Sequence, residues 1–205
     1  MTGAAPLEAV VIETARLRLR RLAERDIAGF AALADDPLVY ATTLRLPSPY
    51  RAEHARAYME MQRAGLAAGD HLLLTIALKD EDTAIGSIGL TIDHGNNRAE
   101  IGFWIGTPYW NRGLTTEAAA ALVGYGFERL GLNRIWGGHF AGNEASGRVQ
   151  RKIGMKPEGI LRQCLCKNGT YHDDVVHAVL REEFEPRVAW SAKPADEAAG
   201  GRRGG

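Results

Sequence analysis

The residues best suited to chemistry lie around one glycine, Gly113, near the middle of the chain. A stretch of strand character ends near Gly106, a turn follows at 111–113, and a helical pattern begins directly after it. The first turn of a helix has backbone N–H groups without intrahelical partners and a partial positive charge, so it suits a phosphate or pyrophosphate. The arginine of the turn adds positive charge, and Thr115 and Thr116 add hydroxyl donors. The alternative is an ordinary turn glycine, because strand–turn–helix junctions are common.

A second polar segment follows, in which a strand runs into a short helix whose first turn contains Asn143 and Ser146. Asn143 is a natural N-cap, so helix capping is the alternative to ligand binding for both residues. The remaining titratable candidates are His139 and His172, although a lone histidine on a strand is more often structural. The adjacent residues His172-Asp173-Asp174 cannot all face one ion from a strand, because side chains alternate between its faces. We therefore expect no metal site.

The elements that position these residues alternate between strand and helix patterns. We expect strands at 16–20, 72–78, 84–92, 98–106, 134–140, 160–166 and 171–180, and helices at 23–34, 51–67, 114–130 and 145–153. Asn168-Gly169 predicts a hairpin turn between the last two strands. The short connections favour antiparallel pairing. The pattern therefore predicts an α/β (α+β) fold whose central mixed, mostly antiparallel sheet has about seven strands, flanked by about four helices.

Composition limits the classes of function. The 205 residues fit one domain, and 25 basic residues balance 25 acidic ones, so a broad basic face for nucleic acid is not expected. No apolar run approaches the roughly 18 residues that span a bilayer, and the N-terminus lacks the pattern of a signal peptide. Cys164 and Cys166 are too close together for an unstrained disulfide, and we expect both to be reduced. These features predict a cytoplasmic protein that binds neither membrane nor nucleic acid.

The two ends differ from the middle of the chain. Residues 1–12 carry no clear pattern, and residues 186–205 become rich in Gly, Ala and charge. Such a composition buries too little apolar surface to order itself. We therefore expect a flexible N-terminus at 1–12, one domain at 13–185 and a disordered tail at 186–205.

The two polar segments together resemble the GNAT superfamily of acyl-coenzyme A-dependent N-acetyltransferases, in particular its Rim-type branch, which acetylates the α-amines of ribosomal proteins. The pattern A-E-I-G-x-W-I…Y-W-x-x-G-x-x-T-E-A…L-G-L-N-R-I…N-x-x-S-x-x-V-x-x-K-x-G runs in order through 99–154. The opening segment at 13–20 and the closing segments at 171–175 and 178–181 are similar to the branch as well. The resemblance covers about 13–185. It implies a GNAT fold, acetyl-coenzyme A as the acyl donor, no metal, and a primary amine as acceptor.

The resemblance also implies roles for individual residues. The pyrophosphate loop of the family falls on 110–115, where Gly113 is the central glycine. Trp110 and Thr115 depart from the broad family pattern at its first and last positions. The backbone at Ile105 and Thr107 corresponds to the strand that pairs with pantetheine. The cofactor-binding residues implied in this way are Ile105, Gly106, Thr107, Asn111, Arg112, Gly113, Leu114, Thr115, Thr116, Asn143 and Ser146.

For catalysis, the acceptor amine must lose a proton before it attacks the thioester. Glu100 is the candidate base, acting through water; the alternative is a surface carboxylate paired with an arginine such as Arg98. Many relatives place a tyrosine seven positions after the asparagine, but this chain has Gln150 there. Ser146 remains as a group that can orient the coenzyme sulfur or its leaving thiolate. No residue resembles an activated nucleophile, so the resemblance implies direct attack in a ternary complex.

Several alternatives stay open. The acceptor can be the N-terminal α-amine of a protein or peptide, or a small-molecule amine. The donor can carry another acyl group, such as succinyl, and the missing tyrosine leaves room for a coenzyme A-binding module without activity. The chain can act as a monomer or a homodimer.

Overall fold

The computed structural model describes residues 5–195, whose nine strands form a single sheet in the order β7-β8-β6-β5-β4-β3-β2-β1-β9. The strands are β1 (Val10–Glu13), β2 (Leu17–Arg20), β3 (His71–Leu78), β4 (Ala84–Asp93), β5 (Arg98–Ile105), β6 (Arg134–Phe140), β7 (Lys156–Lys167), β8 (Thr170–Leu180) and β9 (Ser191–Pro194). The α-helices of this part of the chain are α1 (Ile27–Ala34), α2 (Pro37–Thr42), α3 (Ala52–Ala68), α4 (Leu114–Glu128) and α5 (Glu144–Lys152). None of its helices is long and apolar enough to cross a membrane.

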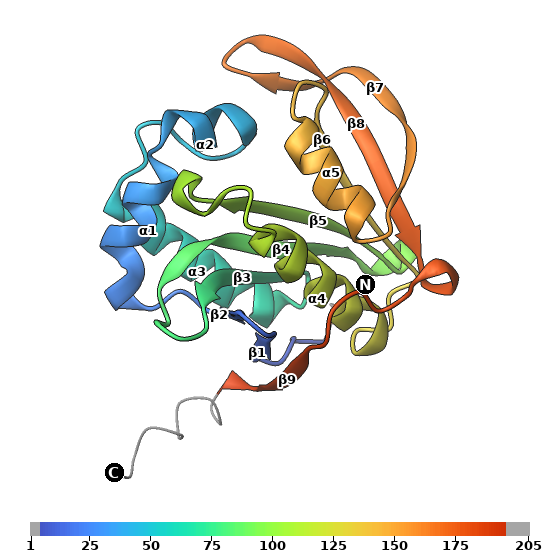
Figure 1. The fold of residues 1–205 in the computed structure, drawn as a ribbon, viewed down its shortest axis with the longest axis horizontal. Helices are drawn as coiled ribbons and strands as arrows, with labels where there is room; N and C mark the ends of the chain where they lie inside the picture. The colour runs from blue at the N-terminus through green and yellow to red at the C-terminus, as the bar shows by residue number, and fades with distance from the viewer. Residues whose placement is uncertain (1–4, 196–205) are drawn as a thin grey trace.

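The sheet is antiparallel at every pairing except that of β5 with β6. The parallel pairing extends only from Arg98 opposite Arg134 to Glu100 opposite Trp136. Beyond these residues, β5 continues beside β4 and β6 continues beside β8, and the two strands diverge (Figure 1). The predicted class, a mixed and mostly antiparallel sheet with helices on its faces, is confirmed. The divergence in its middle creates the space for a site.

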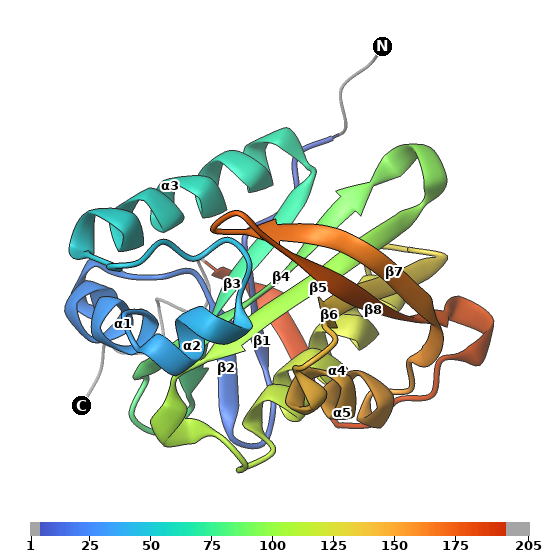
Figure 2. The same ribbon diagram turned by 90° about the horizontal axis from the view of Figure 1, so that it is seen from above.

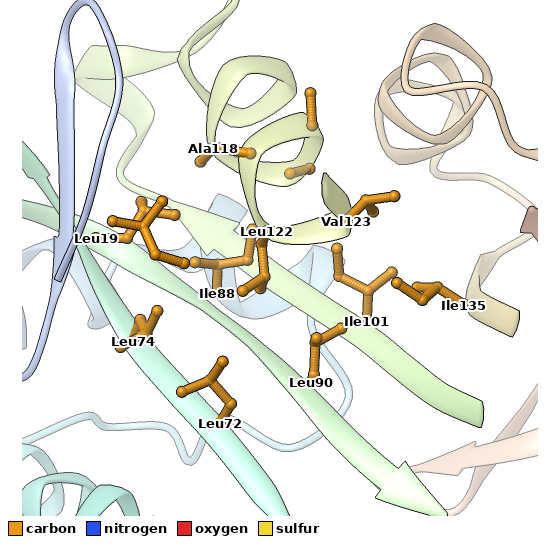
Figure 3. Close-up of a cluster of buried hydrophobic side chains, with 14 of the residues drawn as sticks. Leu19, Leu72, Leu74, Ile88, Leu90, Ile101, Ala118, Leu122, Val123 and Ile135 are labelled. Atoms are coloured by element: carbon orange, nitrogen blue, oxygen red, sulfur yellow. The ribbon is translucent and has the colours of Figure 1, made fainter. Parts of the chain in front are cut away.

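Helices cover both faces of the sheet (Figure 2). α1 and α3 lie on one face, where Phe30, Tyr50 and Ala55 form a buried cluster. α4 lies on the other face and packs against the main core. Its alanine-rich segment at 118–121 is fully buried or nearly so, which lets the helix approach the strands closely. Figure 3 shows Ala118 and Leu122 of α4 above Ile88 and Ile101 of the sheet.

The structure corrects the prediction for the two ends. Within the expected flexible N-terminus, β1 pairs with β2, and within the expected tail, β9 pairs with β1 in a register that places Val10 opposite Pro194. Trp190 leads into β9 and packs on Tyr125 of α4. A four-residue edge strand that ends in proline gives little sequence signal, because its register depends on a partner almost the whole chain away. Residues 1–4 and 196–205, which the prediction also covered, lie outside the described part.

Two local predictions have opposite outcomes. The helix expected at 23–34 ends at Ala34 as α1 does, but Asp36 then begins the unpredicted α2. Its side chain accepts a hydrogen bond from the Leu38 N–H at 2.7 Å, and Pro37 occupies the first helical position. The predicted hairpin turn between β7 and β8 is confirmed, with left-handed φ angles of 50° at Asn168 and 78° at Gly169.

Candidate active site

A cavity of about 940 Å³ occupies the divergence of β5 and β6 and reaches both faces of the sheet. On the face of α4 and α5 its lining includes Thr115 and Ser146, and on the face of α3 it includes Tyr58 and Ser87. One ligand can therefore enter from each face and meet the other where the strands separate.

The turn before α4 has the geometry that the sequence predicted for a phosphate site. Asn111 and Gly113 both adopt left-handed φ angles, 61° and 73°, and Gly113 is the N-cap of α4. The helix hydrogen bonds begin with the Glu117 N–H, which donates to the Gly113 carbonyl at 3.0 Å. The N–H groups at 114–116 precede this bond, so they have no partner within the helix. Gly113, Leu114, Thr115 and Thr116 all line the cavity.

Three residues that the sequence analysis missed hold this turn in place. The Arg16 guanidinium donates to the carbonyl oxygen of Arg112 at 3.0 Å and forms an ion pair with Glu117 at 2.6 Å. Thr14 donates its hydroxyl to the other Glu117 oxygen, also at 2.6 Å. Burial raises the pKa of Glu117, but the hydrogen bonds from Thr14 and Arg16 outweigh that effect and lower it. The signal that could have found this cluster was an acidic residue in the first turn of α4.

The backbone groups that β5 directs into the cavity differ in part from the predicted pair, Ile105 and Thr107. The Gly106 N–H donates to Ile85 of β4 at 2.9 Å. Because hydrogen-bonding direction alternates along a strand, Ile105 and Phe103 direct their N–H and C=O groups away from β4, into the divergence. The Trp110 indole N–H donates to the Ile105 carbonyl at 2.7 Å. Ile105 and Phe103 line the cavity, so the backbone available there is at 103 and 105.

Three residues of the predicted cofactor set lie outside the cavity lining. A Cβ added at Gly106 would contact Leu33, so this glycine serves close packing with α1. Thr107 donates its hydroxyl to Asp36 at 2.6 Å. Arg112 is exposed and its guanidinium lies 5.7 Å from the centre of the Tyr109 ring. The structure thus assigns Gly106 and Thr107 to the joint between β5 and the first two helices.

The first turn of α5 contributes Asn143 and Ser146 to the cavity. Asn143 is the N-cap, and its side-chain oxygen accepts from the Ser146 N–H at 3.2 Å, so the capping interpretation holds for Asn143. The Ser146 hydroxyl has no capping role and is half-buried at the cavity. Gln150 is 1% exposed, and its side-chain oxygen accepts no hydrogen bond from the described residues.

The opposite face of the cavity carries Glu100 among aromatic side chains. Glu100 is half-buried on β5 and shares a face of the strand with Trp104. Trp104 packs edge-on against Phe30 at 4.9 Å between ring centres. The Tyr58 hydroxyl lies 2.7 Å from Ser87 Oγ, and burial raises the pKa of the Tyr58 phenol well above its ordinary value.

The β7–β8 hairpin extends over this face and contacts α2 and the residue that follows it. The Lys167 ammonium donates to the Thr43 carbonyl at 2.6 Å and also to the Tyr40 carbonyl, and it lies 3.7 Å from the centre of the Tyr40 ring. The Asn168 side chain donates to the Tyr40 hydroxyl at 2.7 Å. Both cysteines are free and exposed on β7, and Cys164 lines the cavity.

Comparisons with known proteins identify the family. A family model for the acetyltransferase (GNAT) domain matches residues 16–156. The chain belongs to the GNAT acetyltransferase family. It is similar to the uncharacterized N-acetyltransferase YoaA of Bacillus subtilis (strain 168), with 33% identity over 177 residues that cover 83% of this chain and 97% of YoaA. The predicted resemblance, the enzyme class and the use of a coenzyme A-based acyl donor are confirmed.

Two further comparisons concern the Rim-type branch. The putative ribosomal N-acetyltransferase YdaF of Bacillus subtilis (strain 168) is 41% identical over 101 residues, which cover 49% of this chain and 55% of YdaF. The structure of Mycobacterium smegmatis RimJ in complex with CoA-disulfide superposes with a TM-score of 0.78 at 21% identity, and covers 88% of this chain and 91% of RimJ. The second likeness concerns the fold alone.

Within this acetyltransferase, the structure brings most of the predicted site residues to one cavity. Those that line it are Glu100, Ile105, Asn111, Gly113, Leu114, Thr115, Thr116, Asn143 and Ser146. The cavity of the GNAT enzyme also contains groups that the sequence did not assign to the site, including His139, Asp174, Tyr50 and Tyr58. Burial raises the pKa of Tyr50 to about 12.

Proposed function

We propose that this acetyltransferase transfers the acetyl group of acetyl-coenzyme A to a primary amine by direct attack in a ternary complex. The observation that carries this proposal is the single cavity that reaches both faces of the sheet at the β5–β6 divergence. One face offers unpaired helix N–H groups to a diphosphate, and the other offers the Glu100 carboxylate, near aromatic rings, to an amine.

The donor binds on the face of α4 and α5. The N–H groups at 114–116 and the left-handed turn at Gly113 suit the pyrophosphate. The backbone of Phe103 and Ile105 directs hydrogen-bonding groups into the divergence, so it replaces Thr107 in the predicted pairing with pantetheine. Asn143 and Ser146 lie at the next helix, where we place the end of the pantetheine arm that carries the sulfur. Arg112, exposed beside the turn, supplies charge to the outer phosphates. No metal takes part in this scheme.

The acceptor enters from the face of α3. Glu100 removes a proton from the bound ammonium through a water molecule, and the neutral amine then attacks the thioester carbon. Ser146 donates a hydrogen bond to the sulfur as it becomes a thiolate. Because a thioester is already activated, positioning of the two substrates supplies much of the rate.

One relative supports a particular class of acceptor. The stretch that is 41% identical to a putative ribosomal N-acetyltransferase favours the N-terminal α-amine of a protein or peptide over a free small amine. A peptide can enter beneath the β7–β8 hairpin, where Leu161 and Tyr171 are exposed apolar side chains. We place this reaction in the cytoplasm, carried out by a monomer or a homodimer without nucleic acid or membrane.

A panel of amines and peptides, assayed for release of free coenzyme A from acetyl-coenzyme A, tests the function. We expect turnover with at least one α-amine peptide. Glu100→Gln should lower kcat by on the order of 100-fold, the usual contribution of a general base, and Ser146→Ala by about ten-fold, as for one hydrogen bond to a charged group. Glu60→Gln is the matched control, because Glu60 is an exposed α3 carboxylate paired with Arg63.

Two results would count against the proposal in different ways. If the wild-type enzyme releases no coenzyme A with any amine while it binds acetyl-coenzyme A in calorimetry, the chain is a binding module. If it is active and both variants keep the wild-type kcat, the roles of Glu100 and Ser146 are wrong although the reaction stands. The same panel run with succinyl-coenzyme A determines the acyl preference.

A further inference from the structure

Asp174 is a buried carboxylate at the cavity for which the reaction scheme above has no role. It lies in the middle of β8, is 7% exposed and lines the cavity. Its Oδ1 atom is buried and accepts no hydrogen bond from any described residue. Buried polar atoms in proteins nearly always have a partner, so an unpartnered carboxylate oxygen at a substrate cavity indicates a missing ligand.

The neighbouring strand makes room for this carboxylate. A Cβ added at Gly138 of β6 would overlap both carboxyl oxygens of Asp174, so the carboxyl group occupies the space of the missing side chain. Gly138 lies two residues beyond Trp136, the last β6 residue that pairs with β5. The carboxyl group of Asp174 therefore lies beside the divergence, on the same face of the sheet as Glu100.

Within the described part of the chain, this carboxylate has no cation as a direct partner. Asp174 lies opposite Phe140 on β6 and Leu161 on β7, both uncharged. Among the described residues, no lysine, arginine or histidine forms an ion pair with it. Burial raises the pKa of the Asp174 carboxyl, and the charge of His139 and a hydrogen bond from its backbone only partly offset that effect. The His139 ring itself points to the other face, beneath Gly147 of α5.

We propose that Asp174 binds the ammonium group of the acceptor directly and thereby selects cationic primary amines. This inference rests on the proposed function and assigns to its acceptor side a residue that the sequence did not indicate. An ammonium group has three hydrogens, so one can bond Asp174 Oδ1 while another is passed through water to Glu100. A cation also supplies the charge that stabilises the ionised form of a buried carboxylate.

The test compares two acceptors of the same shape and different charge. The first is the fastest arylmethylamine of the panel, such as benzylamine, an alkylamine that is protonated at pH 7. The second is the matching arylhydrazine, such as phenylhydrazine, in which –CH2–NH2 is replaced by –NH–NH2 and which is neutral at that pH because the ring withdraws electron density from the nitrogen. Asp174→Asn keeps the shape and removes the charge. We expect kcat/KM for the alkylamine to fall about 100-fold, as for a buried charge pair that loses one partner, and kcat/KM for the hydrazine by less than about three-fold.

Two further variants make the test specific. Gly138→Ala leaves Asp174 in place but displaces its carboxyl group, and it should reproduce the same selective loss. Asp173→Asn is the matched control, because Asp173 Oδ1 accepts a hydrogen bond from the Gln163 N–H at 2.8 Å, which an asparagine oxygen can also accept. Calorimetry should show unchanged binding of acetyl-coenzyme A to all three variants.

The outcomes separate this inference from the proposed function. An inactive wild-type enzyme refutes the proposed function. Equal losses for the alkylamine and the hydrazine in Asp174→Asn, or an alkylamine rate within three-fold of wild type, refute the role of Asp174 while acetyl transfer stands. Loss of acetyl-coenzyme A binding in Asp174→Asn would assign the residue to the fold and would equally refute the inference.

Discussion

The two faces of the cavity are built in different ways. On the face that we propose for the coenzyme, called the coenzyme face, the turn at Gly113 and the first turns of α4 and α5 come from short segments whose geometry is local. On the acceptor face, the lining combines the segment after α2, α3, β5 and the β7–β8 hairpin. Lys167 of the hairpin and Thr43 after α2, which join two of these segments, are 124 positions apart in the chain.

This difference separates the face proposed to bind the shared substrate, acetyl-coenzyme A, from the face proposed to select the acceptor amine. A helix N-terminus binds a diphosphate through backbone groups, which any sequence with the correct turn can provide. The proposed acceptor site depends on side chains, such as Glu100 and Asp174, brought together by tertiary contacts. Changes in one acceptor-face segment can therefore alter the amine that is used without disturbing coenzyme binding.

The largest effect that tests this comparison should come from Gly113→Ala. Its φ of 73° is left-handed, a conformation that costs a residue with a Cβ about 1–2 kcal/mol. The turn should relax and direct its N–H groups away from the diphosphate, and this cost corresponds to roughly ten-fold weaker binding of acetyl-coenzyme A. Isothermal titration calorimetry measures the change.

Gly131 provides a matched control at the other end of α4. It has a φ of 69°, and a Cβ there would lie 3.7 Å from an arginine nitrogen, the same distance as for Gly113. Gly131→Ala should therefore lose a similar amount of stability and keep full affinity for acetyl-coenzyme A. Equal affinity losses in both variants would show that the strain spreads through the helix and that Gly113 has no particular role.

The same contrast explains how much of the enzyme the sequence predicts. The elements with strong periodicity, the hairpin at Asn168 and the left-handed turn at Gly113 are local features, and their positions follow from residue type. The pairing of β9 with β1 and the partnership of Arg16 with Glu117 join segments about 100 or more positions apart. In the sequence, Asp174 is one of two adjacent carboxylates on an expected strand. The cross-strand gap at Gly138, which depends on strand pairing, distinguishes it from Asp173.

An intermediate effect is expected where the long-range cluster supports the local turn. Glu117→Gln removes the charge that Arg16 and Thr14 stabilise, and should lower the free energy of unfolding at pH 7 by about 1–2 kcal/mol. Because the pKa of Glu117 is lower in the folded state, its contribution is complete above the unfolded pKa of about 4.3 and is lost as the pH falls through the folded pKa.

Thermal unfolding at a series of pH values checks this prediction. The stability difference between wild type and Glu117→Gln should be constant near neutrality and shrink at acidic pH. Glu128→Gln, an exposed carboxylate at the other end of α4, should change stability little at any pH. A difference that persists unchanged at acidic pH would mean that packing, and not the charge of Glu117, supports the turn.

The smallest effect should come from the contact that closes the acceptor face. Lys167→Met keeps the apolar stem of the side chain and removes its hydrogen bonds to Thr43 and Tyr40. The loss of about 1 kcal/mol should raise KM for the amine roughly five-fold, because the segment after α2 no longer holds its place over the cavity. The Kd for acetyl-coenzyme A should stay the same, since that substrate is proposed to bind through the opposite face.

Lys156→Met, at the far end of β7 and paired with Glu183, is the control. A parallel loss of acetyl-coenzyme A affinity in Lys167→Met would show that the two faces are coupled, and the division between a locally built face and an assembled one would fail.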